Sequence, residues 1–139
     1  KLPKCAANSP RGKKIGTLRA WRFMTGLKRG DVVLVLFPNS DLITFKRRPA
    51  LVVQADNLDT GLSQVVIAMI TSNLARRGHP SRVFIPLNSP AAKGSGLLTD
   101  SIVMTDNLAT ALDKAIVSKL GQLADMKQIE IALRVTLGL

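Results

Sequence analysis

Five short apolar runs, rich in β-branched residues, limit the fold of this chain more than any other feature. Polar turns with Pro, Gly, Asn or Asp separate them at intervals of about 10 to 18 residues. The expected strands are residues 32–37, 50–54, 64–70, 82–87 and 101–104. Pro86 indicates an edge strand or a strand end, because proline cannot donate a ladder hydrogen bond. Strands of this length and spacing predict a small antiparallel barrel or a strongly curved sheet.

The apolar period changes at the C-terminus. The apolar positions there recur at steps of three or four residues: Leu123, Met126, Ile129, Leu133 and Leu137. This spacing predicts a helix that packs on the core through one face. Asp125 stands three residues before Gln128, which resembles a capping box and predicts a helix start near Met126, and Gly138 predicts its end. Residues 112–120 fit either a strand or a short helix.

Composition excludes several classes of protein. The 139 residues suffice for one domain, and the longest apolar runs have six residues, far short of the roughly 20 that cross a bilayer. A single cysteine, Cys5, and a single histidine, His79, exclude an internal disulfide, a thiolate metal site and a multi-histidine zinc site. We therefore expect no metal and no cofactor. The first 23 residues lack the apolar core of a secretory signal, so we expect a cytoplasmic protein.

The net charge of +11 is concentrated at the N-terminus. The first 23 residues hold seven Lys and Arg residues and no acid, whereas 13 basic residues face 9 acidic ones from Met24 onward. We predict that residues 1–23 form a basic extension, either a native flexible arm or sequence added upstream. Residues 24–139 then form the folded domain. A basic extension of this kind attracts polyanions.

Four motifs occur in a specific order. They are Gly30-Asp31-Val-Val-Leu-Val, Arg48-Pro49-Ala-Leu-Val-Val, Ile70-Thr71-Ser72 and Asp100-Ser101-Ile-Val-Met-Thr-Asp106-Asn107. From about Lys28 to its end the chain resembles the MazF/PemK toxins of type II toxin–antitoxin systems. The resemblance implies a mainly β fold, an SH3-like barrel of the MazF/PemK/CcdB type with a C-terminal helix. It also implies a homodimer that cleaves single-stranded RNA without a metal, leaving a 2′,3′-cyclic phosphate and a 5′-hydroxyl. The implied partner is a small acidic, MazE-like antitoxin.

The resemblance assigns three residues to catalysis. Metal-free RNA cleavage must remove the 2′-hydroxyl proton, stabilise a dianionic phosphorane and protonate the leaving oxygen. The guanidinium of Arg48 suits the phosphorane because its donors match two phosphate oxygens. Thr71 follows a strand that we expect to be buried, so its hydroxyl would emerge at the barrel rim. Asp106 corresponds to an acid that some family members use as a general base.

Seven further residues are candidates for RNA binding. Most are cations that suit a phosphate track, and Phe45 is the one candidate for base stacking. The set is Phe45, Lys46, Arg47, Ser72, Arg76, Arg77 and Arg82. His79 is a weaker candidate for an acid or base.

Two departures from the family pattern leave alternatives open. Met104 and Ala109 stand where relatives often have arginine. The acid–base assignment is therefore less secure than the roles of Arg48 and Thr71. One alternative is a non-catalytic toxin of the same fold that binds a protein target, as CcdB-like gyrase poisons do. Another is an RNA-binding barrel that has lost catalysis.

Overall fold

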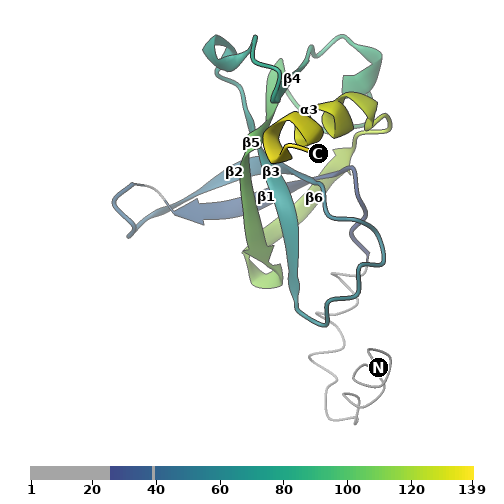
Figure 1. The fold of residues 1–139 in the computed structure, drawn as a ribbon. Coiled ribbons are helices and arrows are strands. Elements are labelled where there is room, and N and C mark those ends of the chain that lie inside the picture. The colour runs from purple at the N-terminus through teal and green to yellow at the C-terminus, as the bar shows by residue number, and fades with distance from the viewer. Residues whose placement is uncertain (1–25, 39) are drawn as a thin grey trace, which may run out of the picture.

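Six strands form one antiparallel sheet in the order β4-β5-β3-β2-β1-β6. The computed structural model describes residues 26–38 and 40–139, so the predicted N-terminal extension lies outside the described residues. The strands are β1 (Asp31–Pro38), β2 (Phe45–Val52), β3 (Gln64–Thr71), β4 (Arg82–Ile85), β5 (Ser101–Leu112) and β6 (Ile116–Gln122). Three 3-10 turns, η1 (Leu74–Arg76), η2 (Pro90–Ala92) and η3 (Asp113–Ala115), and the helix α3 (Lys127–Leu137) complete the fold (Figure 1).

The core has two parts, one on each face of the sheet. Because successive side chains of a strand point to opposite faces, neighbouring residues are divided between them. On β1, Val32 packs under α3 with Ile129, whereas Val33 and Val35 pack on the other face with Ile116. The sheet therefore curls around one cluster and carries the helix over the other. This arrangement confirms the predicted mainly β, barrel-like fold with a C-terminal helix.

The barrel is not fully closed. β4 and β6 are the two edges of the sheet. The loop between β4 and β5, residues 86–100, lies against β6. Within this loop, Gly94 accepts a hydrogen bond from the amide of Gln122 at 2.8 Å. Gly121 lies directly against Gly94 and Ser95, where a side chain would overlap backbone atoms. The absence of a Cβ at position 121 thus allows the loop to lie on β6.

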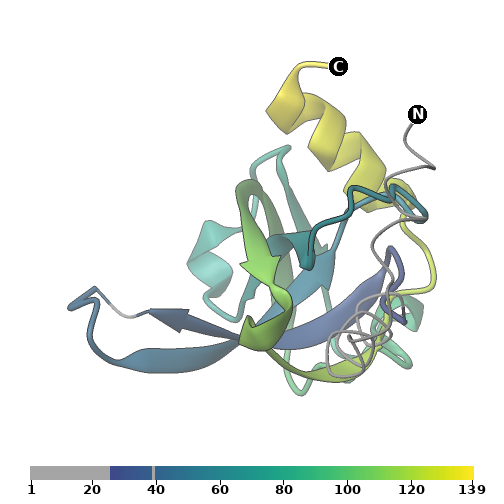
Figure 2. The same cartoon turned by 90° about the horizontal axis from the view of Figure 1, so that it is seen from below.

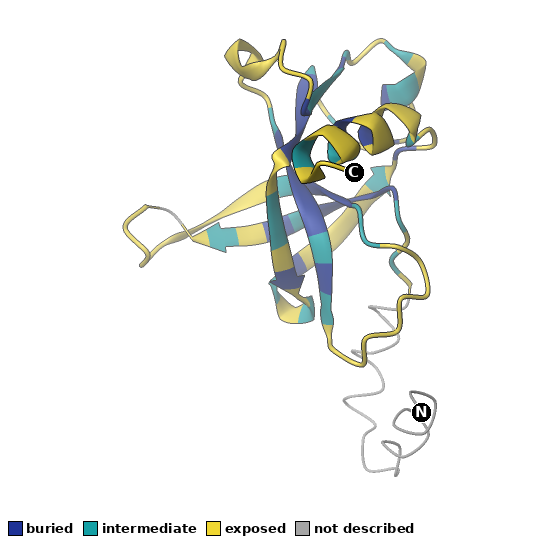
Figure 3. Ribbon diagram, viewed as in Figure 1, coloured by how far each residue is buried: buried dark blue, intermediate teal, exposed yellow. Residues whose placement is uncertain are grey.

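A hairpin arm projects from this sheet. β1 pairs with β6 only as far as Val35, and β2 pairs with β3 only from Ala50 onward. Residues 36–38 and 45–47 therefore pair only with each other, and we call this pair of segments the arm. Figure 2 shows the arm extending away from the side that carries α3, and Figure 3 shows its largely exposed surface.

The helix starts close to the predicted position but without the predicted cap. Met126 is its N-cap residue and makes no side-chain capping bond, while Asp125 accepts a hydrogen bond from the amide of Lys127 at 3.0 Å. Gly138 ends the helix in the left-handed conformation, as predicted. Ile129 is fully buried, but Leu137 at the last turn is exposed, so it does not belong to the core.

Strand boundaries differ from the predictions in three places. β2 begins at Phe45 rather than at residue 50, because the arm continues the hairpin beyond the core. β4 ends at Ile85, before Pro86. The strand predicted for residues 101–104 runs on to Leu112, and the ambiguous segment that follows contains η3 and β6.

Asp31 fixes the start of β1. It is fully buried, its Oδ2 accepts the amide of Lys28 at 2.8 Å, and its Oδ1 lies 3.3 Å from Nζ of Lys119 on β6. A buried carboxylate is tolerated where it is paired and hydrogen-bonded.

Within the residues that the structure describes, no helix has the length and apolarity needed to cross a bilayer.

Candidate active site

A pocket of about 170 Å³ opens at the root of the arm. Its walls come from β1, β2, β3, η1 and β5, which are far apart in the sequence. The lining residues are Phe37, Arg48, Met69, Ile70, Thr71, Arg76, Met104 and Asn107. Three of the predicted functional residues, Arg48, Thr71 and Arg76, therefore meet in one place.

Pairing between strands brings Arg48 to the pocket. It lies opposite Val35 and shares the face of the sheet that Val35 and Ala50 occupy. Ala50 pairs with Met69, so continuing this register by two residues sets Arg48 opposite Thr71. Pro49 lies between Arg48 and the paired part of β2, and because it has no N–H the ladder stops there. The side chain of Arg48 is exposed and free to meet a ligand in the pocket.

Thr71 is the last residue of β3, and its hydroxyl also supports the turn that follows. Its Oγ1 accepts a hydrogen bond from the amide of Asn73 at 3.1 Å. The side chain of Asn73 in turn accepts from the amide of Ala75 at 3.2 Å and so caps η1. Two consecutive local bonds thereby lead the chain from Thr71 to Arg76, the third polar residue of the pocket wall.

A large bulge in β5 positions the residues around Asp106. Ala68 of β3 pairs with Leu108, but the next residue, Met69, pairs with Met104, so residues 105–107 are left out of the ladder. Bulges redirect side chains and often occur beside active sites. Here Asn107 lines the pocket, whereas Asp106 points to Arg82 on β4.

Arg82 engages both oxygens of the Asp106 carboxylate. Nη2 lies 2.8 Å from Oδ2 and Nε lies 3.4 Å from Oδ1, a fork geometry in which both side chains are partly shielded from water. The hydrogen bonds from Arg82 hold the pKa of the Asp106 carboxyl below its ordinary value, and the same pair raises the pKa of Arg82. Asp106 is therefore a weaker proton acceptor than an unpaired carboxylate.

Two arginines hold the loop that carries η1. Arg82 also donates from Nη1 to the backbone oxygen of Arg76 at 3.1 Å. The guanidinium of Arg77 lies over the ring of Phe84, 5.0 Å from its centre, which is within the range of a cation–π contact. Arg77 and Arg82 thus both have partners within the protein.

The remaining predicted residues lie around the pocket rather than in it. Phe45, Lys46 and Arg47 are exposed on the arm, and Ser72 is exposed between β3 and η1. Lys46 shares the face of Arg48, because residues two apart on a strand point the same way, while Phe45 and Arg47 lie on the opposite face. Sequence reasoning gave no role in the site to Phe37 or Asn107, although Asn107 directly follows the predicted Asp106.

The pocket is electrically positive. Two of its eight lining residues are arginines, none is acidic, and Thr71 and Asn107 add neutral hydrogen-bonding groups. Guanidinium groups bind phosphate through two parallel donors, and the apolar walls limit the access of water. The site is therefore equipped to hold a phosphate group and to stabilise extra negative charge on it.

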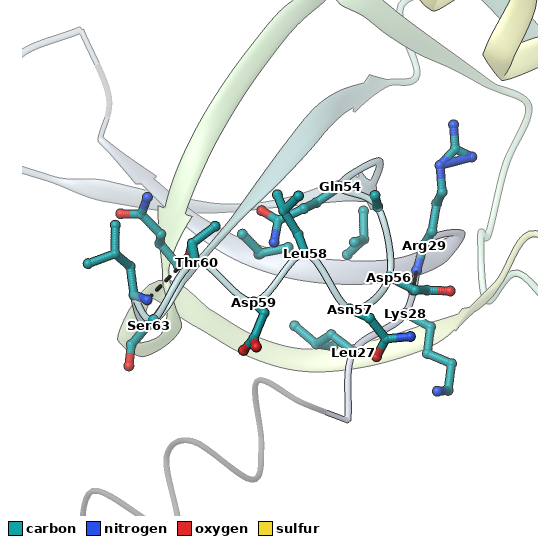
Figure 4. Close-up of a pocket in the computed structure, with 16 residues that line it drawn as sticks. Leu27, Lys28, Arg29, Gln54, Asp56, Asn57, Leu58, Asp59, Thr60 and Ser63 are labelled. Atoms are coloured by element: carbon teal, nitrogen blue, oxygen red, sulfur yellow. Dashed lines mark hydrogen bonds between the residues drawn. The ribbon is translucent and has the colours of Figure 1, made fainter. Parts of the chain in front are cut away.

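A larger hollow of about 470 Å³ lies elsewhere, beside the β2–β3 loop. Figure 4 shows that its walls come from residues 27–29 and from this loop, with Lys28 and Arg29 near Asp56. None of the predicted site residues lines it, and the amide of Arg29 is bonded to the Asp56 carboxylate at 2.8 Å. The smaller pocket is therefore the candidate active site.

Comparison with known proteins identifies the family. Residues 28–138 match the sequence profile of the PemK-like, MazF-like toxins of type II toxin–antitoxin systems. The chain belongs to this family. The resemblance seen in the ordered motifs is thereby confirmed, and the match covers every strand, the helix and the pocket of the PemK/MazF-type domain.

Individual PemK/MazF relatives agree with this assignment. Endoribonuclease MazF6 of Mycobacterium tuberculosis is 33% identical over 80 residues, which cover 57% of this chain and 70% of that protein. A solved endoribonuclease from a mycobacterial species is 27% identical, covers 84% of this chain and 96% of its own, and superposes with a TM-score of 0.61. A second mycobacterial structure, an endoribonuclease in complex with its cognate antitoxin, is 25% identical with a TM-score of 0.61 and covers 81% and 96%.

Proposed function

We propose that this MazF-like toxin is a metal-independent, sequence-specific endoribonuclease that cleaves single-stranded mRNA and thereby stops translation and growth. The meeting of Arg48 and Thr71 at one acid-free pocket carries the proposal. Its further support is the family match and the activity that the names of the relatives print. A purely protein-binding toxin would have no need of a pocket that suits a phosphate group.

The proposed reaction uses the 2′-hydroxyl of the RNA as the nucleophile. Its oxygen forms a bond to the adjacent phosphorus while the bond from phosphorus to the 5′-oxygen breaks. The 2′-hydroxyl loses its proton, and the departing 5′-oxygen gains one. The products are a 2′,3′-cyclic phosphate and a 5′-hydroxyl end.

Arg48 and Thr71 have distinct roles in this reaction. The guanidinium of Arg48 binds the non-bridging phosphate oxygens and neutralises the charge that develops on them. Such electrostatic stabilisation of the transition state is usually the largest single contribution to catalysis. The hydroxyl of Thr71 orients the reacting phosphate or the 2′-hydroxyl. Asp106 as general base stays a prediction from the resemblance, and its pairing with Arg82 argues for a different role, developed below.

The RNA strand is proposed to follow the cations around the pocket. Arg76 lines the pocket, Lys46 extends the face of Arg48 along the arm, and Ser72 lies at the rim. Phe45 and Arg47 are proposed to contact the RNA from the other face of the arm. Arg82 keeps fewer free donors, because Asp106 and the carbonyl of Arg76 occupy three of them, and the Phe84 ring covers one face of the Arg77 guanidinium.

The proposed partners follow the relatives. A small acidic, MazE-like antitoxin would cover the positive pocket, as a cognate antitoxin accompanies the mycobacterial endoribonuclease. The toxin is proposed to act as a homodimer in the cytoplasm. Its folded domain is proposed to span residues 24–139, with residues 1–23 as a basic extension.

The decisive experiment incubates the full chain with a long RNA in excess EDTA. The fragment ends are sequenced and tested for cyclic phosphate, and Arg48→Ala is run beside the wild type. Discrete cuts that vanish in Arg48→Ala support the proposal and reveal the recognised sequence. RNA that stays intact across varied sequences overturns it. A salt-sensitive complex with intact RNA would then indicate a barrel that binds without cleaving, and a stable protein complex would indicate a protein target.

A further inference from the structure

We propose that Arg82 and Asp106 together form a positioning bracket that holds Arg76 at the pocket, and that neither takes part in proton transfer. The proposal rests on the endoribonuclease function proposed above. It assigns a role to an ion pair that joins β4 to the bulge of β5.

The first argument is the geometry of the pair. Both oxygens of Asp106 face Arg82, at 2.8 and 3.4 Å, and Asp106 is not among the residues that line the pocket. A general base must come within hydrogen-bond reach of the proton that it removes. The bulge turns Asn107 toward the pocket and Asp106 toward β4, so its carboxylate is directed at a protein partner.

The second argument is the third donor of the same guanidinium. Nη1 of Arg82 donates to the backbone oxygen of Arg76 at 3.1 Å. Asp106 therefore orients Arg82, and Arg82 fixes the last residue of η1. The side chain of that residue is part of the pocket wall. The side chain of Arg76 can bind and orient a phosphate group in a fixed geometry only if its backbone is held in place.

The third argument is that the rest of this loop is anchored independently at both ends. At its start, the hydroxyl of Thr71 accepts from the amide of Asn73, and the side chain of Asn73 accepts from the amide of Ala75 in η1. At its end, the amide of Ser81 donates to Nδ1 of His79 at 3.1 Å, and the carbonyl of Ser81 accepts from the buried hydroxyl of Thr105 at 2.6 Å. Between these ends the bracket holds the loop at Arg76, next to the contact of Arg77 with Phe84.

A double-mutant cycle tests this assignment in the full chain. The single variants are Arg82→Gln, Asp106→Asn and Arg76→Ala, and kcat and KM for cleavage of one defined RNA are measured for each. We expect Arg82→Gln and Asp106→Asn to lower kcat/KM by a similar factor of about ten. In the Arg76→Ala background, either substitution should cause no further loss.

The pH profile separates the bracket from a general base. A bracket leaves the pH dependence of kcat unchanged in Asp106→Asn, whereas loss of a base removes the limb that the base controls. A loss in Asp106→Asn that far exceeds the loss in Arg82→Gln, persists without Arg76 and changes the pH profile would overturn the proposal. Arg82→Lys, which keeps the charge but not the fork, is expected to recover only part of the activity.

Amide hydrogen exchange provides a readout that does not depend on cleavage. The amides of Arg76 and Arg77 bond to Asn73 and Leu74 in the wild type, and they should exchange faster in Arg82→Gln. The amide of Glu130 in α3 should be unaffected. If the wild type cleaves no RNA, the proposed function fails, and this exchange pattern alone decides whether the bracket exists; unchanged exchange in η1 overturns it.

A matched control uses a second arginine–carboxylate ion pair at the protein surface. Arg29 lies 3.4 Å from Glu130 and lines no part of the candidate active site. Arg29→Gln removes one arginine and one ion pair, as Arg82→Gln does, and should leave kcat, KM and the exchange of η1 unchanged. A loss in Arg29→Gln equal to that in Arg82→Gln would show that general charge, and not the bracket, is responsible.

Discussion

Arg48 and Thr71 line the same pocket although their strands pair with each other only farther into the sheet, where Ala50 lies opposite Met69. Pro49 ends the ladder between them and leaves room for a ligand at the point where two more backbone bonds would otherwise form. The arm and the sheet thus diverge at the proposed reaction centre.

Replacement of Arg48 by lysine should lower kcat/KM by at least about tenfold, because lysine keeps the charge but loses the paired donors. Cleavage of a defined RNA at several salt concentrations measures the effect. Lys46→Arg, on the same face of the arm but outside the pocket, serves as the control and should retain nearly full activity. Equal activity of Arg48→Lys and the wild type would show that two-pronged recognition of phosphate is unnecessary.

Replacement of Thr71 by valine should lower kcat/KM by about 10- to 100-fold, the usual range for removing a hydrogen bond to a charged group. Thr71→Ser keeps the hydroxyl and should retain most of the activity. Thr110→Val, an exposed threonine on β5, is the matched control. If Thr71→Val were as active as Thr71→Ser, the hydroxyl would have no part in the reaction.

The pair of Arg82 and Asp106 should make stability depend on pH in acid. Because the folded-state pKa of Asp106 is lowered from 3.8, its stabilisation is fully present above that value and disappears as the pH falls through the lower folded value. The difference in Tm between wild type and Asp106→Asn should therefore be constant from about pH 7 to pH 5 and vanish in stronger acid. A difference that grows on acidification would contradict the lowered pKa.

Gly121→Ala should lower the free energy of unfolding by about 1–3 kcal/mol, because the new Cβ would overlap backbone atoms of Gly94 and Ser95 that cannot turn away. Urea denaturation measures the loss. Ser118→Ala, at an exposed position of the same strand, should change it by less than about 0.5 kcal/mol. Two equal values would mean that the loop does not lie on β6 in solution.

Two isoleucines of α3 provide a test of how the helix packs. Ile129 is 0% exposed and Ile131 is 53% exposed, so Ile129→Ala should cost about 2–5 kcal/mol and Ile131→Ala much less. Thermal unfolding of both variants measures the contrast. A comparable loss at Ile131 at high protein concentration, but not at low concentration, would reveal that this side of the helix is covered by another molecule.

The sequence was most informative where a pattern is local. Runs of β-branched residues predict part of every strand except β6, and the step of three or four residues predicts α3. Local patterns also explain why a predicted strand boundary is wrong. Residues 105–107 contain Asp and Asn, which are typical of turns, so the pattern predicts a strand end at Met104, although the chain there forms a bulge within β5.

Contacts between residues that are distant in the chain could not be predicted from the sequence. Arg82 and Asp106 are 24 residues apart, and nothing in the local pattern of either predicts the ion pair that turns Asp106 away from the pocket. Asn107 and Phe37 became visible as wall residues only once the strands were placed side by side. Arg48, Thr71 and Arg76 could be proposed because their residue types suit phosphate, but their meeting required the register of β2 on β3.

The arm holds Arg48 in a fixed position at its root and leaves its tip free to vary. The register of β1 on β2 sets Arg48 opposite Val35, and a slip by one residue would present Arg47 to the pocket instead. That register is held at the root, where both strands join the sheet, and not at the tip, where Leu42 and Ile43 are exposed. In the proposed complex with RNA, insertions and deletions at the tip would change the contacts of the arm while the guanidinium of Arg48 stays in place.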